Sequence, residues 1–337
     1  MHRRPRIKLF FLTLLLIISQ SALVFGQNIQ AQPATFFTPA DTFNKSRTYG
    51  LLSAGSVAYL SSTWVLYHAW YKDYALTAFH LVDDRNTWQN TDKAGHAYTA
   101  WMQGSLTYDL AKWTGASNKQ AIIAGITTGL LFQSTVEMLD GFSRDWGFSM
   151  TDFAADVAGT ALFATQQYFW DEQKIKLKFS VFPQQYPDEP VLSDDGTTSM
   201  LLSERATMLY GNNLAVRTLK DYNAQKYWLS AGLQDLTGSD RFPAWLNISV
   251  GYSAENLFGG MENHWMKNGK TYTLDPIKYP RYHQIYIAPD VDWSRIHTRV
   301  PWLKTLFKLL NLTKTPAPAI EIHNRDGWKV AFRVLVF

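Results

Sequence analysis

The chain has 337 residues, 15% of them aromatic, and contains no cysteine. This composition excludes disulfides, thiolate metal sites, a cysteine nucleophile and a lipid-modified cysteine. Lys and Arg number 32 against 28 Asp and Glu, a formal net charge of +4 at pH 7.

The first 26 residues are typical of a secretory signal peptide, with an uncleaved membrane anchor as the alternative. Four basic residues precede a short apolar stretch: Arg3, Arg4, Arg6 and Lys8. Small residues follow, and we predict cleavage near Gly26. Because these four charges equal the net excess (32 − 4 = 28), the mature chain is neutral, which excludes nucleic acid as a partner. We expect an exported protein in the periplasm or at the outer membrane.

Residues 46–176 have a helical pattern. Apolar periodicity and capping residues predict four helices, over residues 50–71, 92–113, 117–140 and 149–172. Short connections favour an antiparallel bundle of about four helices. Small residues four apart indicate close helix packing, in a membrane or in a soluble protein: Ala121, Gly125, Gly129, Ala155 and Gly159.

Residues 177–205, with several Pro and Asp, are predicted to be a linker, and residues 206–337 a β-rich domain. Strands are predicted over residues 227–233, 245–252, 282–288, 319–323 and 328–337. A terminal aromatic residue is typical of outer-membrane barrels, but six or seven strands fall short of the usual eight. We therefore expect an α+β protein with a small antiparallel β region, and a barrel-like arrangement as the alternative.

One predicted helix, near residues 302–311, interrupts the strands. Its apolar residues share one face and two lysines share the other: Trp302, Leu303, Leu306, Phe307 and Leu310, then Lys304 and Lys308. Such a basic amphipathic helix lies on a membrane surface or packs on the sheet.

Ionisable residues form stripes on three of the predicted helices: Asp92 with His96, Glu137 with Asp140, and Asp152 with Asp156. Burying such groups unpaired is costly, so we expect the stripes to meet in one interior cluster with Lys93 near its rim. Taken singly, each has a structural interpretation. Asp92 and Asp152 suit helix capping, Asp156 a salt bridge with Lys93 or Arg144, and His96 a buried core position.

The cluster suggests candidate roles for its members. Candidate catalytic residues are His96, Glu137, Asp140 and Asp156, and candidate substrate-binding residues are Lys93 and Asp92. A divalent cation is the candidate cofactor, with possible ligands His96, Glu137, Asp140 and Asp152.

The motif residues resemble a known family. Asp92-Lys93-x-x-His96, Glu137-x-x-Asp140 and the segment from Trp146 to Gly159 are similar to the uncharacterised DUF2279 family, and more loosely to VanZ-like membrane proteins. The resemblance implies the fold of residues 92–159 and an envelope location, and it implies no activity. Lipid anchoring cannot be carried over, because the printed sequence has no cysteine.

Two functional hypotheses follow. The first is a membrane-associated structural or binding module of the cell envelope, with a membrane surface or an envelope component as its partner. The second is a membrane-surface hydrolase or transferase acting on a lipid, phosphate or glycan group. There His96 would be the general base, and Lys93 would hold an anionic group.

Overall fold

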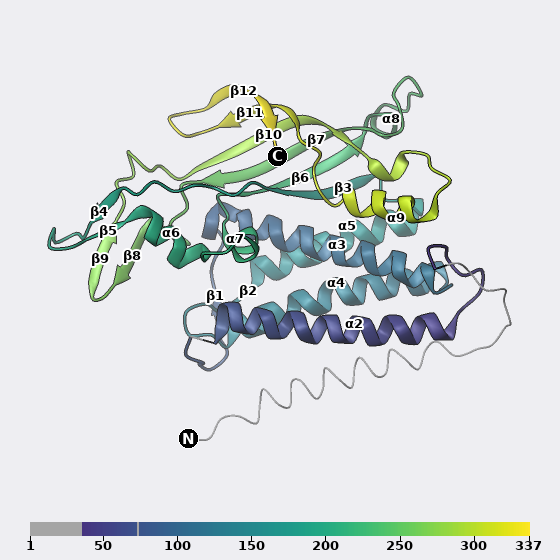
Figure 1. Cartoon of the computed structure of the whole chain (residues 1–337), viewed down its shortest axis with the longest axis horizontal. Coiled ribbons are helices and arrows are strands. Elements are labelled where there is room, and N and C mark those ends of the chain that lie inside the picture. The colour runs from purple at the N-terminus through teal and green to yellow at the C-terminus, as the bar shows by residue number, and fades with distance from the viewer. Residues whose placement is uncertain (1–35, 73) are drawn as a thin grey trace.

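The computed structural model describes residues 36–72 and 74–337, in which helices form one layer and a curled sheet the other (Figure 1). Helices occupy the first half of the described chain and antiparallel strands most of the second. The predicted α+β class is therefore confirmed. The predicted signal peptide, residues 1–26, lies outside the described residues.

The four predicted helices are present. They are α2 (Lys45–Leu66), α3 (Thr91–Trp113), α4 (Asn118–Gly141) and α5 (Met150–Trp170). A capping box of Ser117 and Gln120 begins α4. Helices α3, α4 and α5 pack on one another, whereas α2 is peripheral, with Thr48 and Thr63 as its buried residues. A π-helical turn, η2 (Tyr67–Tyr71), extends α2.

Small residues allow the three packed helices to approach closely. A Cβ atom added to Gly159 on α5 would lie 2.0 Å from the Ala97 carbonyl oxygen on α3. One added to Gly125 on α4 would lie 2.6 Å from the Gly104 carbonyl oxygen, also on α3. The backbones of α4 and α5 therefore contact α3 directly, and side chains near these crossings are held in fixed positions.

Helix α4 is the one described helix that is long and apolar enough to cross a membrane. Core helices of helical proteins share this property. Helices α3 and α5 both pack against it.

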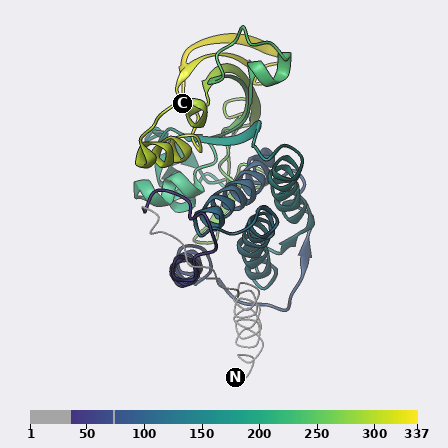
Figure 2. The ribbon, with the colours of Figure 1, turned by 90° about the vertical axis from the view of Figure 1, so that its right-hand side faces the viewer.

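Six antiparallel strands form the main sheet: β3 (Ile175–Val181), β6 (Gln225–Gly232), β7 (Leu246–Glu255), β10 (Tyr282–Val291), β11 (Ala317–His323) and β12 (Lys329–Val336). Their order is β12-β11-β10-β7-β6-β3, with β3 nearest the helices (Figure 1). Figure 2 shows how strongly the sheet curls. Among the described strands no ladder joins β12 to β3, so the barrel-like alternative is not realised as a closed barrel.

The short elements lie around this frame. Two-residue strands β1 (Leu81–Val82) and β2 (Phe148–Ser149) pair in parallel, and the turn η3 (Thr87–Asn90) follows β1 in the chain. Two small hairpins and four further short helices follow: β4 (Pro190–Leu192) with β5 (Ser199–Leu201), β8 (His264–Lys267) with β9 (Lys270–Thr273), α6 (Leu202–Tyr210), α7 (Leu214–Lys220), α8 (Leu233–Thr237) and α9 (Pro301–Leu310). A 3-10 turn, η4 (Trp293–Arg295), precedes α9.

The segment predicted to be a linker, residues 177–205, is structured in part. It contains most of β3, both strands of the β4–β5 hairpin and the start of α6. Strand β3 alternates lysines with apolar residues, and Lys176 and Lys178 are buried in ion pairs. The two lysines make the strand hard to recognise from the sequence, because lysine side chains are rarely buried unless they are paired with an opposite charge.

The two faces of the sheet have an unusual distribution of polarity. One row of directly paired apolar residues crosses all six strands: Leu177, Leu229, Val250, Ile287, Ile320 and Phe332. Beyond Leu177 these side chains are between 38% and 69% exposed. The opposite face is buried, and it combines a hydrophobic cluster that includes Trp228, Tyr286 and Ala288 with many polar groups. There the Lys178 ammonium lies 2.8 Å from an Asp290 carboxylate oxygen. We call the face of the sheet that carries this apolar row the apolar face.

We predict that Gly159→Ala destabilises the protein by about 1–3 kcal/mol, because the new methyl group overpacks the crossing of α5 and α3. Urea denaturation measures the effect. Gly50→Ala on α2 is the matched control, since a Cβ there meets no atom within 4 Å. It should be neutral or stabilising by up to about 1 kcal/mol, as expected for Gly→Ala within an exposed helix. Equal effects of the two substitutions would contradict this packing.

Candidate functional site

The predicted polar stripes converge where α3 crosses α4 and α5. Residues Asp92, Lys93 and His96 lie on the first two turns of α3. Glu137 projects from the last turns of α4, and Asp156 from the second turn of α5. The close backbone packing of these helices brings the three segments together.

His96 lies between two carboxylates. Its Nδ1 atom lies 3.0 Å from Asp156 Oδ1, and its Nε2 atom lies 3.7 Å from Glu137 Oε1. The side-chain amide of Gln133 donates a 2.9 Å hydrogen bond to Asp156 Oδ1. Glu137 and Asp156 are at most 1% exposed. The predicted convergence of His96 with these two acids is therefore observed.

A second group surrounds Lys93. Its ammonium lies 2.7 Å from Asp84 Oδ2, 3.1 Å from Asp92 Oδ2 and 3.0 Å from Asp152 Oδ1. Asp84 also accepts 2.6 Å hydrogen bonds from the hydroxyls of Ser149 and Thr151. The charge of Lys93 is thus neutralised within the protein, an arrangement that disfavours the predicted role in holding an external anion.

Several sequence expectations are refined by these contacts. Asp140 accepts a 2.8 Å hydrogen bond from the Tyr71 hydroxyl and makes no direct bond to His96. Asp152 belongs to the Lys93 group, with Asp84 and Asp92. Asp156 pairs with His96, as the predicted cluster requires, and the alternative interpretation of Asp156 as the partner of Lys93 or Arg144 is wrong. The N-cap of α3 is Asn90, not Asp92.

Sequence reasoning missed Asp84. It lies in a loop without periodicity, and β1 brings it to the cluster by pairing with β2, which ends at Ser149. Asp83 and Asp84 are adjacent in the chain, and nothing in the sequence indicates which of the two side chains points into the cluster.

A left-handed turn fixes the start of α3. Trp88, Gln89 and Asn90 have φ angles of 51°, 53° and 61°, a conformation that non-glycine residues rarely adopt. The Trp88 amide donates a 2.8 Å hydrogen bond to the Gly260 carbonyl, and the hydroxyl of Tyr252 on β7 donates one to the Gln89 carbonyl. The loop after β7 and the sheet itself therefore position Asp92 and Lys93.

Burial and charge change the pKa values of the cluster. Burial raises the pKa of Glu137 to about 8, although His96 and the Ser149 amide oppose the change. Burial likewise raises the pKa of Asp140 to about 7, against the Tyr71 hydrogen bond. Burial alone would lower the pKa of His96, but its bond to Asp156 and the surrounding carboxylates outweigh this effect and raise it to about 9. The cluster therefore holds protons tightly near neutral pH when no other cation is present.

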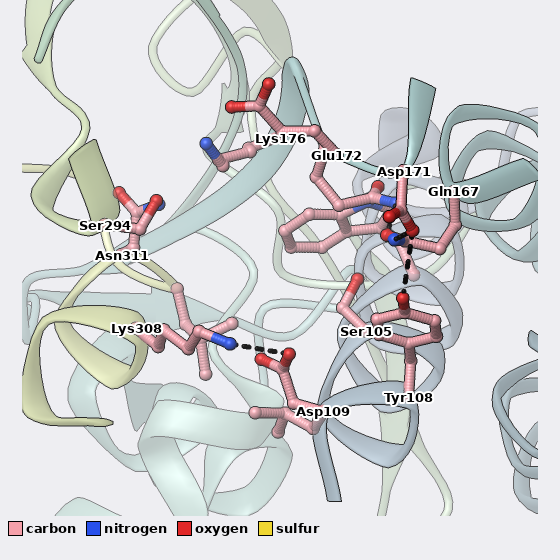
Figure 3. A pocket seen from close by; sticks show the side chains of 14 residues that line it. Ser105, Tyr108, Asp109, Gln167, Asp171, Glu172, Lys176, Ser294, Lys308 and Asn311 are labelled. Atoms are coloured by element: carbon pink, nitrogen blue, oxygen red, sulfur yellow. Dashed lines mark hydrogen bonds and ion pairs between the residues drawn. The ribbon is translucent and has the colours of Figure 1, made fainter. Parts of the chain in front are cut away.

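Two cavities lie outside the cluster. One, of about 300 Å³, lies between the C-terminal halves of α3 and α5, strand β3 and α9 (Figure 3). Its polar groups bond to one another, as Lys308 does to Asp109 and Tyr108 to Asp171. The other, of about 340 Å³, is an apolar cleft between α3 and the apolar face of the sheet, lined by Ala94, Ala97, Tyr98, Leu229, Val250 and Ile285 among others.

Comparison with known proteins gives one match. Residues 82–167 match the model of the DUF2279 family, described as predicted periplasmic lipoprotein. The resemblance to DUF2279 is confirmed. The match includes every cluster residue from Asp84 to Asp156 and is consistent with the predicted exported, envelope-associated location. No curated protein and no solved structure matches the chain.

We predict that metal-free protein loses stability as the pH rises from about 5 to about 9. Glu137, Asp140 and His96 all have raised pKa values in the folded protein, so over this interval the folded state binds more protons than the unfolded state. The free energy of unfolding then falls as pH rises. Urea denaturation after chelator treatment measures it at several pH values. Glu137→Gln should make the fall in the free energy of unfolding with pH shallower. A free energy of unfolding that stays constant or rises with pH would refute the raised pKa values of these three groups.

Proposed function

We propose that this envelope protein is a membrane-associated structural or binding module, which contacts lipid through the apolar face of its sheet. The observation that carries the proposal is the polarity of the six strands. A water-exposed antiparallel sheet normally turns its polar face to solvent. Here most polar groups of the strands lie on the buried face. The apolar row is exposed on β10, β11 and β12, at Ile287, Ile320 and Phe332, whereas Leu229 and Val250 of the same row line the cleft beside α3. Alternation with apolar residues outward and polar residues inward is the pattern of strands that face lipid.

The amphipathic helix α9 is a second feature that suits contact with lipid. Helix α9 exposes Trp302, Leu306, Leu309 and Leu310 and carries Lys304 and Lys308. Apolar residues beside basic ones suit the boundary between acyl chains and anionic headgroups. Lys308 also pairs with Asp109 on α3, which fixes α9 against the helical layer.

The family description gives independent support. DUF2279 members are described as predicted periplasmic lipoproteins, which are attached to a membrane by lipid. The printed sequence has no cysteine to carry such a lipid. Within the described residues, the exposed apolar side chains of the sheet and of α9 offer a means of membrane attachment.

The geometry of the cluster favours binding over catalysis by His96. A general base needs a free nitrogen within reach of the substrate proton. Nδ1 of His96 faces Asp156 and Nε2 faces Glu137. Nδ1 is thus bonded to Asp156, and the pKa of His96, raised to about 9 by its bond to Asp156 and the surrounding carboxylates, keeps the ring protonated near neutral pH. The hydrolase or transferase hypothesis, which needs His96 as a base, therefore has less support.

Flotation with vesicles of phosphatidylethanolamine and phosphatidylglycerol tests the proposal. Wild-type protein should float with the vesicles. The double variant Ile320→Asp, Phe332→Asp should lose at least about tenfold in binding, because two buried charges oppose insertion of the apolar face. Both side chains are exposed, so the fold should tolerate the change.

The control for this experiment is Ile277→Asp. Ile277 is 88% exposed and lies outside the six-stranded sheet, so its substitution should leave flotation unchanged. Wild-type protein that stays out of the vesicle fraction, or variants that all float alike, would refute a lipid-facing sheet.

A further inference from the structure

We propose that His96, Glu137 and Asp156 together bind one divalent transition-metal ion at the junction of α3, α4 and α5. Each of the three residues offers a ligand atom, and these atoms lie within 4.8 Å of one another. This inference is independent of the proposed lipid contact, because it rests on residues of the helical layer alone.

Orphaned buried oxygens point to a missing cation. Within the described residues, Glu137 Oε1 and Asp156 Oδ2 have no hydrogen-bond partner, although both residues are almost fully buried. Leaving a buried carboxylate oxygen without a donor is costly. The Glu137 oxygen is directed toward His96, which makes the space between these two side chains the place for an ion.

The distances suit a shared metal better than a hydrogen bond. His96 Nε2 and Glu137 Oε1 are 3.7 Å apart, too far for a hydrogen bond. Two ligands with metal bonds of about 2.0–2.2 Å can be separated by up to about 4.4 Å. The observed separation therefore leaves room for an ion between them after small rotations.

The second nitrogen of His96 is held as it is in known metal sites. A metal-bound histidine usually donates its other ring N–H to a carboxylate, which fixes the ring. Asp156 Oδ1 lies 3.0 Å from Nδ1 and is itself held by Gln133. The other Asp156 oxygen, Oδ2, stays available to the ion or to a water molecule bound to it.

The position of Lys93 also favours a cation here rather than in the neighbouring group. Lys93 already places a positive charge among Asp84, Asp92 and Asp152. Around His96, by contrast, the two buried carboxylates would neutralise a divalent ion. The imidazole ligand favours Zn²⁺ and related ions over Mg²⁺ or Ca²⁺, which prefer oxygen ligands. The side chain of His96 is 18% exposed, which gives an ion a route of entry.

Isothermal titration of chelator-treated full-length protein with Zn²⁺ tests the proposal. We expect about one equivalent to bind, and Mg²⁺ not to compete for it. His96→Gln, Glu137→Gln and Asp156→Asn should each weaken Zn²⁺ binding at least about tenfold, since ligands and their supporting carboxylates both contribute to affinity.

The matched control is Asp84→Asn, which removes a carboxylate from the Lys93 group and should change affinity only a few-fold. If Asp84→Asn lost Zn²⁺ binding and His96→Gln kept it, the ion would lie in the Lys93 group, and the proposal would be overturned. Failure of wild-type protein to bind Zn²⁺ would do the same.

A second measurement covers the case in which a variant fails to fold. X-ray absorption of the Zn²⁺-loaded wild-type protein should show one imidazole among oxygen ligands. A shell of oxygen ligands alone would overturn the site.

Discussion

The helical layer depends on one constraint: buried carboxylates of α4 and α5 must find positive or hydrogen-bonding partners on α3. His96 meets this need for Asp156, and Lys93 meets it for Asp152. Glu137 accepts a hydrogen bond from the Ser149 amide and lies 3.7 Å from His96. A buried charge without a partner is unfavourable. These contacts therefore favour one rotation of each helix about its axis and one position along its axis relative to its neighbours. The glycine crossings permit close approach, and the ionic contacts determine how the helices are aligned.

The same constraint connects the helices to the sheet. The start of α3, which carries Asp92 and Lys93, is held by the left-handed turn that bonds to Tyr252 and Gly260. Farther along α3, Tyr98 stacks on Phe179 of β3 at a ring-centroid distance of 5.7 Å. The sheet therefore supports the helix on which both His96 and Lys93 lie. A lipid contact on the exposed part of the apolar face would therefore involve the same sheet that supports α3 and positions the cluster.

The sequence was informative where periodicity and composition act locally. Helical spacing located the four helices, and the pairing of stripes predicted the contact of His96 with Glu137 and Asp156. Local patterns could not locate β3, whose buried Lys176 and Lys178 resemble exposed residues until Asp292 and Asp290 are known to face them. Asp84 was missed for a similar reason, because its place depends on the pairing of β1 with β2. The polarity of the sheet is likewise a property of register across six strands, and no single strand reveals it.

The most direct test of the central claim is a double-mutant cycle between His96→Gln and Asp156→Asn, measured by urea denaturation of metal-free protein. If the contact between these residues joins α3 to α5, the two losses of stability will not add, and the coupling will be about 1–3 kcal/mol. Additive losses, with a coupling near zero, would contradict the account, because the two side chains would then be buried beside each other without depending on each other.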